Sequence, residues 1–276
     1  MKPISNTAFY CCGVRMQDAE NEKSVCQDIY AKDFMDERGL KILSSFNSEK
    51  NPNAGNVARH RIIDDYIRKA LTDNLELPVI LVGAGFDSRA YRLNGGRWIE
   101  LDEPKIISYK NEKLPIGQCK NKLQRIAIDF ETEALADKLQ EFSTDQPVIV
   151  VFEGVFIYLP ESVIKQTLQT LHRLFPKHTL ICDLMTENFF KKYSHTLHQK
   201  FGDQLGTGFK FTPQKPTEAF SNSNYQLIEK HSIIGKAIEF GLIKVPLFIF
   251  KTFLKTLEHG YLICIFASDY QKSEMG

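Results

Sequence analysis

The sequence lacks the features that mark several classes of protein. Its six cysteines include no CxxC pair and no regular framework, so we expect reduced thiols rather than disulfides, and no metal site. No window approaches the roughly 18 uncharged apolar residues that an ordinary transmembrane helix needs. The opening residues, MKPISNTAFYCCGVRMQDAE, lack the apolar run of a secretory signal. These absences predict a soluble, cytoplasmic protein without an integral membrane segment.

An excess of charge of one sign is also lacking. The 35 basic and 34 acidic residues leave a net charge of +1, whereas a dedicated nucleic-acid binder normally has a basic excess, so we expect no nucleic-acid partner. Internal repeats and low-complexity segments are absent, which excludes solenoids. The 276 residues, 43% of them hydrophobic, can bury a sizeable core, and we expect residues 1–276 to form a single domain.

What the chain does contain is an alternation of helical and strand-like segments. Residues 56–76 carry apolar side chains at helical spacing, and the run VILVG at 79–83 is typical of a strand buried on both faces. Further strands, each except the last followed by a helical segment, are expected at 97–102, 125–130, 148–153 and 178–184. This alternation predicts an α/β fold with a parallel sheet wound by right-handed crossovers.

Two segments fall outside the alternation. Residues 1–55 are predicted to be a helical extension that packs over the ligand edge of the sheet, and residues 185–222 a lid or substrate insertion. The alternation then returns with a strand at 225–234, a helix near 236–257 and a last strand at 261–268. The helix near 236–257 is unusually apolar, which fits a core helix better than a membrane-surface helix or the lip of an apolar pocket.

Ligands of open α/β sheets bind beyond the carboxyl ends of the strands, so the residues that follow each strand are informative. The first strand is followed by Gly83, Ala84 and Gly85, where a ligand can approach the backbone closely, although a tight turn explains this pattern equally well. A dinucleotide site would have a third glycine where Ser88 stands, and Asp87 would repel a pyrophosphate. The loop therefore disfavours NAD.

Acidic residues end three further strands. Asp102 could accept hydrogen bonds from a ribose diol or cap the helix that opens at Pro104. Asp129 could bond an adenine amino group while Phe130 packs on the base, unless the pair is only a loop acid beside a core aromatic. Glu153 is a reasonable partner for an ammonium group. Together these residues suit a ligand with ribose, adenine and a positive centre, and S-adenosylmethionine has all three.

Seven motifs follow one another along the chain: Arg15 in CGVRMQDAE, DIYAKDF (28–34), VARHRIIDD (57–65), ILVGAGFDSRAYRL (80–93), IELDEPKII (99–107), IAIDF (126–130) and FEGVFIYLP (152–160). In order and spacing they resemble the leucine carboxyl methyltransferase family, including its bacterial branch of S-adenosylmethionine-dependent methyltransferases. The resemblance implies a Rossmann-like class I methyltransferase sheet with helices on both faces, and S-adenosyl-L-methionine as cofactor.

The resemblance also implies roles for individual residues. Arg15 and Arg59 would hold the methionine carboxylate of the cofactor. The implied contacts along the rest of the cofactor are Gly83, Ala84 and Gly85 for methionine and ribose, Asp102 for the ribose hydroxyls, Asp129 and Phe130 for adenine, Glu153 for the amino end, and Tyr158 as a lining residue. Phe130 stands where the family often has leucine. The C-terminal third carries no family motif, which leaves the acceptor open.

The expected reaction is O-methylation by in-line transfer to a small-molecule or protein C-terminal carboxylate, or to a hydroxyl. A carboxylate is already ionised at pH 7 and needs no general base, whereas a hydroxyl benefits from one. The candidate bases are His172, His178, His195 and His198, and none of them is assigned. The alternatives are a catalytically silent S-adenosylmethionine-binding scaffold and, opposed by Asp87 and Ser88, an NAD(P)-linked oxidoreductase.

Overall fold

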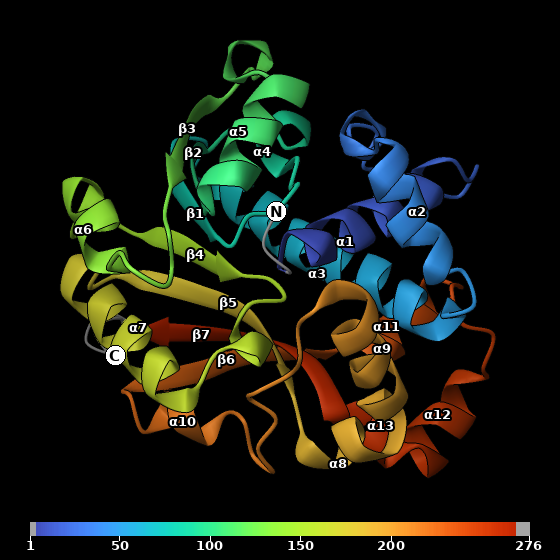
Figure 1. The fold of residues 1–276 in the computed structure, drawn as a ribbon. Helices are drawn as coiled ribbons and strands as arrows, with labels where there is room; N and C mark the ends of the chain where they lie inside the picture. Colours follow the sequence, from blue (N-terminus) through green and yellow to red (C-terminus); the bar gives the residue numbers. More distant parts are fainter. Residues whose placement is uncertain (1–3, 269–276) are drawn as a thin grey trace.

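The strand segments assemble into one seven-stranded sheet in the computed structural model, which describes residues 4–268 (Figure 1). The strands are β1 (Pro78–Val82), β2 (Arg97–Asp102), β3 (Lys122–Ala127), β4 (Val148–Phe152), β5 (His178–Met185), β6 (Tyr225–Ser232) and β7 (Tyr261–Ser268). Their order in the sheet is β3-β2-β1-β4-β5-β7-β6. The first five are parallel, and β7 runs antiparallel between β5 and β6.

Helices cover both faces of this sheet (Figure 1). They are α1 (Ile4–Ala19), α2 (Glu37–Ser45), α3 (Lys50–Asp73), α4 (Arg89–Arg92), α5 (Pro104–Lys113), α6 (Leu135–Leu139), α7 (Glu161–Leu174), α8 (Glu187–Phe189), α9 (His195–Leu205), α10 (Glu218–Ser221), α11 (Ile233–Glu239), α12 (Leu247–Phe253) and α13 (Lys255–Gly260). Short 3-10 turns join several of them, and a π-helix, η5 (Phe190–Ser194), connects α8 to α9. Among the described residues, none of the helices has both the length and the apolar character that a bilayer crossing needs.

Alternate side chains of the strands build two separate cores. Ile80 and Val82 of β1 point toward the layer that contains α6, α7 and α10. Val79 and Leu81 point to the opposite side, where α3, α4 and α11 pack. A strand that is apolar on both sides needs this arrangement, which explains the continuous apolar run of β1. The predicted α/β sheet with helices on both faces is therefore confirmed.

The structure corrects two element predictions. The third strand is Lys122–Ala127 rather than 125–130, because β3 follows β2 in register and Ala127 already lies opposite Asp102, the last residue of β2. The single helix predicted near 236–257 is three short helices, α11 to α13. Pro246 immediately precedes α12, and a proline cannot donate the backbone hydrogen bond that a continuous helix would require there.

The N-terminal helices pack against the loop that follows β1. Phe9 of α1 and Phe34 contact Phe86, whose ring stacks on that of Phe34 with centroids 5.1 Å apart. All three side chains are buried. The segment before β1 therefore lies at the same edge of the sheet as the glycine loop.

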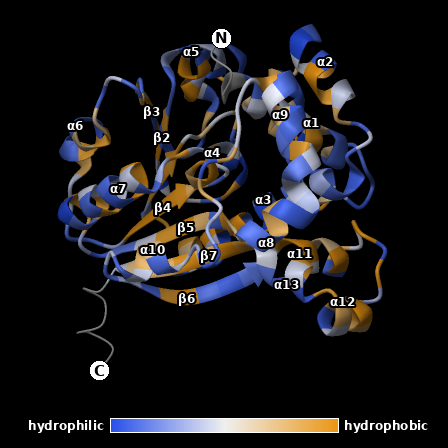
Figure 2. Ribbon diagram, turned by 60° about the horizontal axis from the view of Figure 1, so that its bottom comes forward, coloured by the Kyte–Doolittle hydropathy of each residue, from blue (hydrophilic) through white to orange (hydrophobic). Residues whose placement is uncertain are grey.

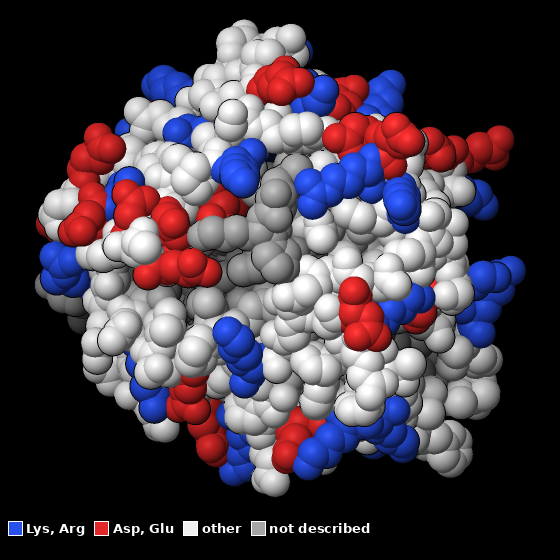
Figure 3. Space-filling model, in the orientation of Figure 1, with Lys and Arg blue, Asp and Glu red and all other residues white. Residues whose placement is uncertain are grey.

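Positive and negative side chains are interspersed over the face of the molecule in Figure 3. No broad stripe of one sign crosses this face, in keeping with the net charge of +1.

Candidate functional site

A cavity of about 810 Å³ lies at the carboxyl ends of β1, β2 and β4. Side chains from α1, α3 and the 187–209 segment complete its walls. This position is where open α/β sheets bind their ligands, and the volume is at the upper end of the range for small-molecule sites.

The glycine loop forms one wall of the cavity. Gly83 has a φ of +69° and Gly85 a φ of +49°, in the left-handed region that favours glycine. The backbone N–H groups of Gly83 and Ala84 both donate to the Leu101 carbonyl, at 2.9 and 3.0 Å, which ties the loop to β2. A Cβ atom at Gly83 would lie 2.6 Å from Cγ2 of Val155, so glycine is required there by both conformation and packing.

Gly83→Ala should lower the free energy of unfolding by about 1–3 kcal/mol, because alanine is strained at this φ and collides with Val155. Urea unfolding followed by circular dichroism measures the change. Gly117→Ala is the matched control, since a Cβ atom there has no neighbour within 4 Å. Equal stability of the two variants would contradict the assigned loop conformation.

Asp102 joins the glycine loop to the end of β2. Its Oδ2 accepts a hydrogen bond from the Gly85 N–H at 2.6 Å, and its Oδ1 accepts one from the Glu103 N–H at 2.7 Å. The side chain lines the cavity, and burial raises its pKa to about 6. The alternative that Asp102 caps the following helix is wrong, because the residue at the cap of α5 is Glu103.

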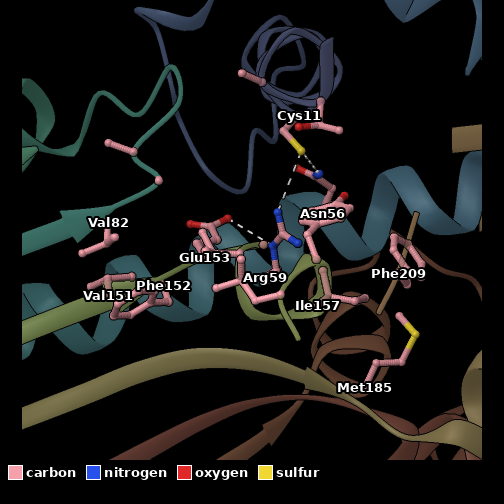
Figure 4. A pocket seen from close by; sticks show the side chains of 18 of the residues that line it. Cys11, Asn56, Arg59, Val82, Val151, Phe152, Glu153, Ile157, Met185 and Phe209 are labelled. Carbon is pink, nitrogen blue, oxygen red and sulfur yellow. Dashed lines mark hydrogen bonds and ion pairs between the residues drawn. The ribbon is translucent and has the colours of Figure 1, made fainter. Parts of the chain in front are cut away.

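Arg59 on α3 points into the cavity beside Glu153 (Figure 4). Its Nε donates to Glu153 Oε1 at 3.2 Å, and its Nη1 donates to the Tyr261 hydroxyl at 2.9 Å. Among the described residues, Nη2 has only the Cys11 sulfur as a partner, at 3.9 Å. The alternative pairing with Asp64 is wrong, because that carboxylate binds the arginines of α4 instead.

Glu153 follows β4 and belongs to a cluster of buried charges. Its Oε2 lies 2.8 Å from Nη2 of Arg89 and 3.2 Å from Nδ1 of His60. Burial alone would raise the pKa of Glu153, but Arg89, His60 and Arg59 together hold it well below its usual range. Glu153 is therefore ionised and shares its charge with arginines.

The same cluster contains a set of potential metal ligands. His60, Asp87 and Glu153 have ligand atoms within 4.8 Å of one another. The guanidinium of Arg89 bonds all three residues. A metal ion would have to displace this buried cation, so the geometry fits an ion-pair network rather than a metal centre.

The remaining predicted residues divide into two groups. Ala84, Phe130 and Tyr158 line the cavity. Arg15 lines it too, but its Nε is bonded to Asp28 at 2.8 Å and its Nη2 donates to the Phe86 carbonyl at 2.7 Å. Gly85 and Asp129 are not among the lining residues, and the Asp129 carboxylate accepts the backbone N–H of Glu131.

The far half of the cavity is apolar and aromatic. Figure 4 shows Ile157, Met185 and Phe209 on the side of Arg59 away from the ends of β1 and β4. Further apolar side chains of this half come from the 187–209 segment and from α11 and α13: Phe189, Leu197, Phe201, Ile234 and Leu257. None of the histidines considered as bases, at 172, 178, 195 and 198, is among the lining residues.

Several residues of the site were missed by sequence reasoning. Asn56 lines the cavity and is one helical turn from Arg59 on the same face of α3. Asp183 on β5 accepts the Gly154 N–H and, at 2.7 Å, the Tyr261 hydroxyl, so it orients groups on both sides of Arg59. Asp183 lies inside β5, two residues before its end, and a buried acid in an otherwise apolar strand is the signal that could have identified it.

Comparison with known proteins decides the family. A family profile described as "Leucine carboxyl methyltransferase" matches residues 9–172. The chain belongs to the leucine carboxyl methyltransferase family. The predicted family is therefore confirmed.

Curated relatives share part of their length with this chain. One from Mycobacterium tuberculosis is 30% identical over 178 residues, which are 57% of this chain and 58% of the relative. One from Parafrankia is 32% identical over 128 residues, 44% of this chain and 41% of the relative. Both are named as candidate S-adenosyl-L-methionine-dependent methyltransferases. This chain thus spans about two fifths to three fifths of the length of these relatives. Their names give S-adenosyl-L-methionine as the methyl donor, which is the cofactor predicted from the sequence.

Solved structures of low sequence identity share the fold. A DUF574 family protein from Streptomyces avermitilis has a TM-score of 0.60 at 10% identity, over 93% of this chain and 96% of that one. A candidate methyltransferase from Thermobifida fusca has a TM-score of 0.59 at 12% identity, over 84% and 89%. At these identities the likeness supports the fold alone, and the predicted class I methyltransferase fold is confirmed.

Proposed function

We propose that the protein transfers the methyl group of S-adenosyl-L-methionine to an ionised carboxylate of an apolar acceptor. The observation that carries the proposal is a single cavity with two unlike halves. One half has Asp102 and Arg59 near the strand ends, and the other is apolar and aromatic. A cofactor and an apolar acceptor can meet inside such a cavity, shielded from water.

The residues of the strand-end half fit the chemistry of the cofactor. Asp102 is a buried acceptor beside the glycine loop, suited to ribose hydroxyls. The Nη2 group of Arg59 faces a thiol rather than an oxygen, so it can donate to the methionine carboxylate. Arg15 supports the loop through the Phe86 carbonyl, and Glu153 balances the charge of Arg59 beside the amino end. S-adenosyl-L-methionine would supply an electrophilic methyl group on a sulfonium.

The lining groups favour an acceptor that needs no base. The acidic side chains that line the cavity have partners among the described residues: Glu49 with Lys200, Asp87 with Arg89, Glu133 with Lys138, Glu153 with Arg59 and Arg89, Asp102 with backbone N–H groups, and Glu103 with a partner of its own. Burial raises the pKa of the Tyr158 phenol well above its usual range. His60 also lines the cavity, but its ring nitrogens lie against Arg89, Glu153 and Arg92. A hydroxyl acceptor would therefore meet no free base among these groups, whereas a carboxylate is ionised at neutral pH.

Transfer of tritium from methyl-labelled cofactor tests the proposal. The acceptors are a panel of aromatic and fatty acids, the matching phenols and alcohols, and peptides with free C-terminal carboxylates. Carboxyl methyl esters release labelled methanol in mild alkali, whereas methyl ethers do not. We expect alkali-labile product from apolar acids, lost in Arg59→Gln and kept in Arg68→Gln, whose exposed side chain is on the same helix. Alkali-stable product from phenols would overturn the carboxylate assignment.

The raised pKa of Asp102 predicts the pH dependence of cofactor binding. Ribose hydroxyls donate to the ionised carboxylate, so affinity should be constant above about pH 6 and fall up to tenfold per pH unit below it. The effect of Asp102 on the stability of the free protein has the opposite sign, because a buried acid with a raised pKa destabilises the fold once it ionises. Calorimetric titrations between about pH 5 and pH 8 measure the profile. A flat profile would exclude the contact.

A further inference from the structure

Helix α12 presents large apolar side chains to solvent. Phe248 and Phe253 are 70% and 74% exposed, the highest values among the exposed large hydrophobic residues of the described chain. Phe250 of the same helix is buried and contacts Gly235 of α11, so the helix is held in place from its inner side. Figure 2 shows α12 in hydrophobic colours at the margin of the molecule, away from the sheet.

The exposed side chains occupy one broad arc of the helix. Successive residues are about 100° apart, so Phe248 and Phe253 project about 140° apart, with the half-buried Ile249 and the exposed Thr252 between them. Phe250 points away from this arc and into the protein. Two nearly free phenylalanines on one helix face are unusual for a surface that stays in water, and they indicate an interaction site.

Lysines surround this apolar face. Lys244 precedes α12, Lys251 is at the rim of the exposed arc, and Lys255 follows the helix, all three exposed. Neither Lys244 nor Lys251 forms an ion pair with a described residue, and Lys255 reaches Glu258 only at 3.8 Å. The face therefore combines exposed aromatic side chains with a positively charged rim. This combination favours binding to the surface of an anionic bilayer.

The same region borders the apolar half of the cavity. α12 packs on α11 and α13, and these two helices contribute Ile234 and Leu257 to the cavity wall. A molecule dissolved in a bilayer under α12 would thus be close to the chamber that we assign to the acceptor.

We propose that α12 docks the protein on anionic membrane surfaces. Phe248 and Phe253 insert among the acyl chains, and Lys244, Lys251 and Lys255 lie at the level of the phosphates. A second copy of the chain is a poorer occupant, because a two-fold contact through this face would bring its lysines against those of the partner. The docking does not depend on methyl transfer.

Sedimentation with large unilamellar vesicles tests the proposal without cofactor or acceptor. One set of vesicles is phosphatidylcholine alone, and the other also contains phosphatidylglycerol. We expect binding to the anionic set, reduced about tenfold or more in Phe248→Ala/Phe253→Ala and in Lys244→Glu/Lys251→Glu. Ile29→Ala/Leu75→Ala, which removes two exposed apolar side chains elsewhere, is the matched control and should bind like the natural protein.

Three outcomes would overturn the docking assignment. They are no binding to anionic vesicles, equal binding by the α12 variants, and a concentration-dependent dimer that the phenylalanine variant abolishes. Cofactor titration of the same variants, which keep the cavity residues near the strand ends, separates failure of this assignment from failure of the proposed function.

Discussion

Arg89→Met should destabilise the protein by about 3–5 kcal/mol in the free energy of unfolding. The Arg89 side chain is fully buried and bonded to Asp64 at 2.5 Å, to Glu153 at 2.8 Å and to Asp87. Methionine fills much of the same volume but carries no charge, so these carboxylates lose a shared cation inside the protein. Removing one partner of a buried ionic network is costly because the remaining charges stay desolvated.

Chemical unfolding in urea, followed by tryptophan fluorescence from the buried Trp98, measures this loss. Arg68→Met is the control, because Arg68 is half exposed and pairs with Asp65 at the surface. The control should change stability by no more than about 0.5 kcal/mol. A comparable small change in Arg89→Met would mean that Asp64, Asp87 and Glu153 are satisfied without it, and the ionic core as described would be incorrect.

Asp102→Asn should weaken S-adenosyl-L-methionine binding by about a hundredfold or more. A hydrogen bond to a charged group contributes about 1.5–3 kcal/mol, and the ribose offers two donors. The amide also has a donor –NH₂ in place of one carboxylate oxygen, and that group would face the N–H of Gly85 or Glu103. The substitution therefore removes an acceptor from the ligand and disturbs the glycine loop.

Calorimetric titration with the methyl donor and with S-adenosyl-L-homocysteine measures this effect. Asp137→Asn, an exposed acid on α6, is the control and should bind both ligands like the natural protein. Circular dichroism establishes that both variants are folded. An unchanged dissociation constant in Asp102→Asn would remove this residue from the proposed cofactor site.

Much of the sheet could be predicted because its strands are buried on both faces. Runs such as VILV and VIVVF are continuous, β-branched and bounded by glycine or acid, and they became β1 and β4. β3 is an edge strand, with a less regular pattern, so its start and end could not be fixed without its pairing to β2. The break between α11 and α12 was not predicted, because Pro246 was interpreted only as a kink in a single helix. In the structure α11 already ends at Glu239, before Gly241 with its φ of +77°, and Pro246 precedes α12.

The sequence predicted which residues belong to the site better than it predicted which of them contact one another. The motifs identified Arg15, Arg59 and Glu153 as site residues. A motif does not show, however, whether a charged side chain binds a ligand or forms an ion pair with another residue of the protein. The partners of Arg59 are Glu153 just after β4, Asp183 on β5 and Tyr261 on β7, far apart along the chain, and only the fold brings them together. Asn56 is three positions before Arg59, so the helical period of 3.6 residues could have placed both on one face.

Methyl transfer by this protein requires that the strand-end half of the cavity bind S-adenosyl-L-methionine. Isothermal titration of the purified protein with this cofactor and, separately, with NADH tests it most directly. We expect one site of micromolar affinity for the methyl donor, loss of that affinity in Arg59→Gln, and no heat of binding with NADH. A well-folded protein that does not bind the methyl donor, or that binds NADH instead, would contradict it.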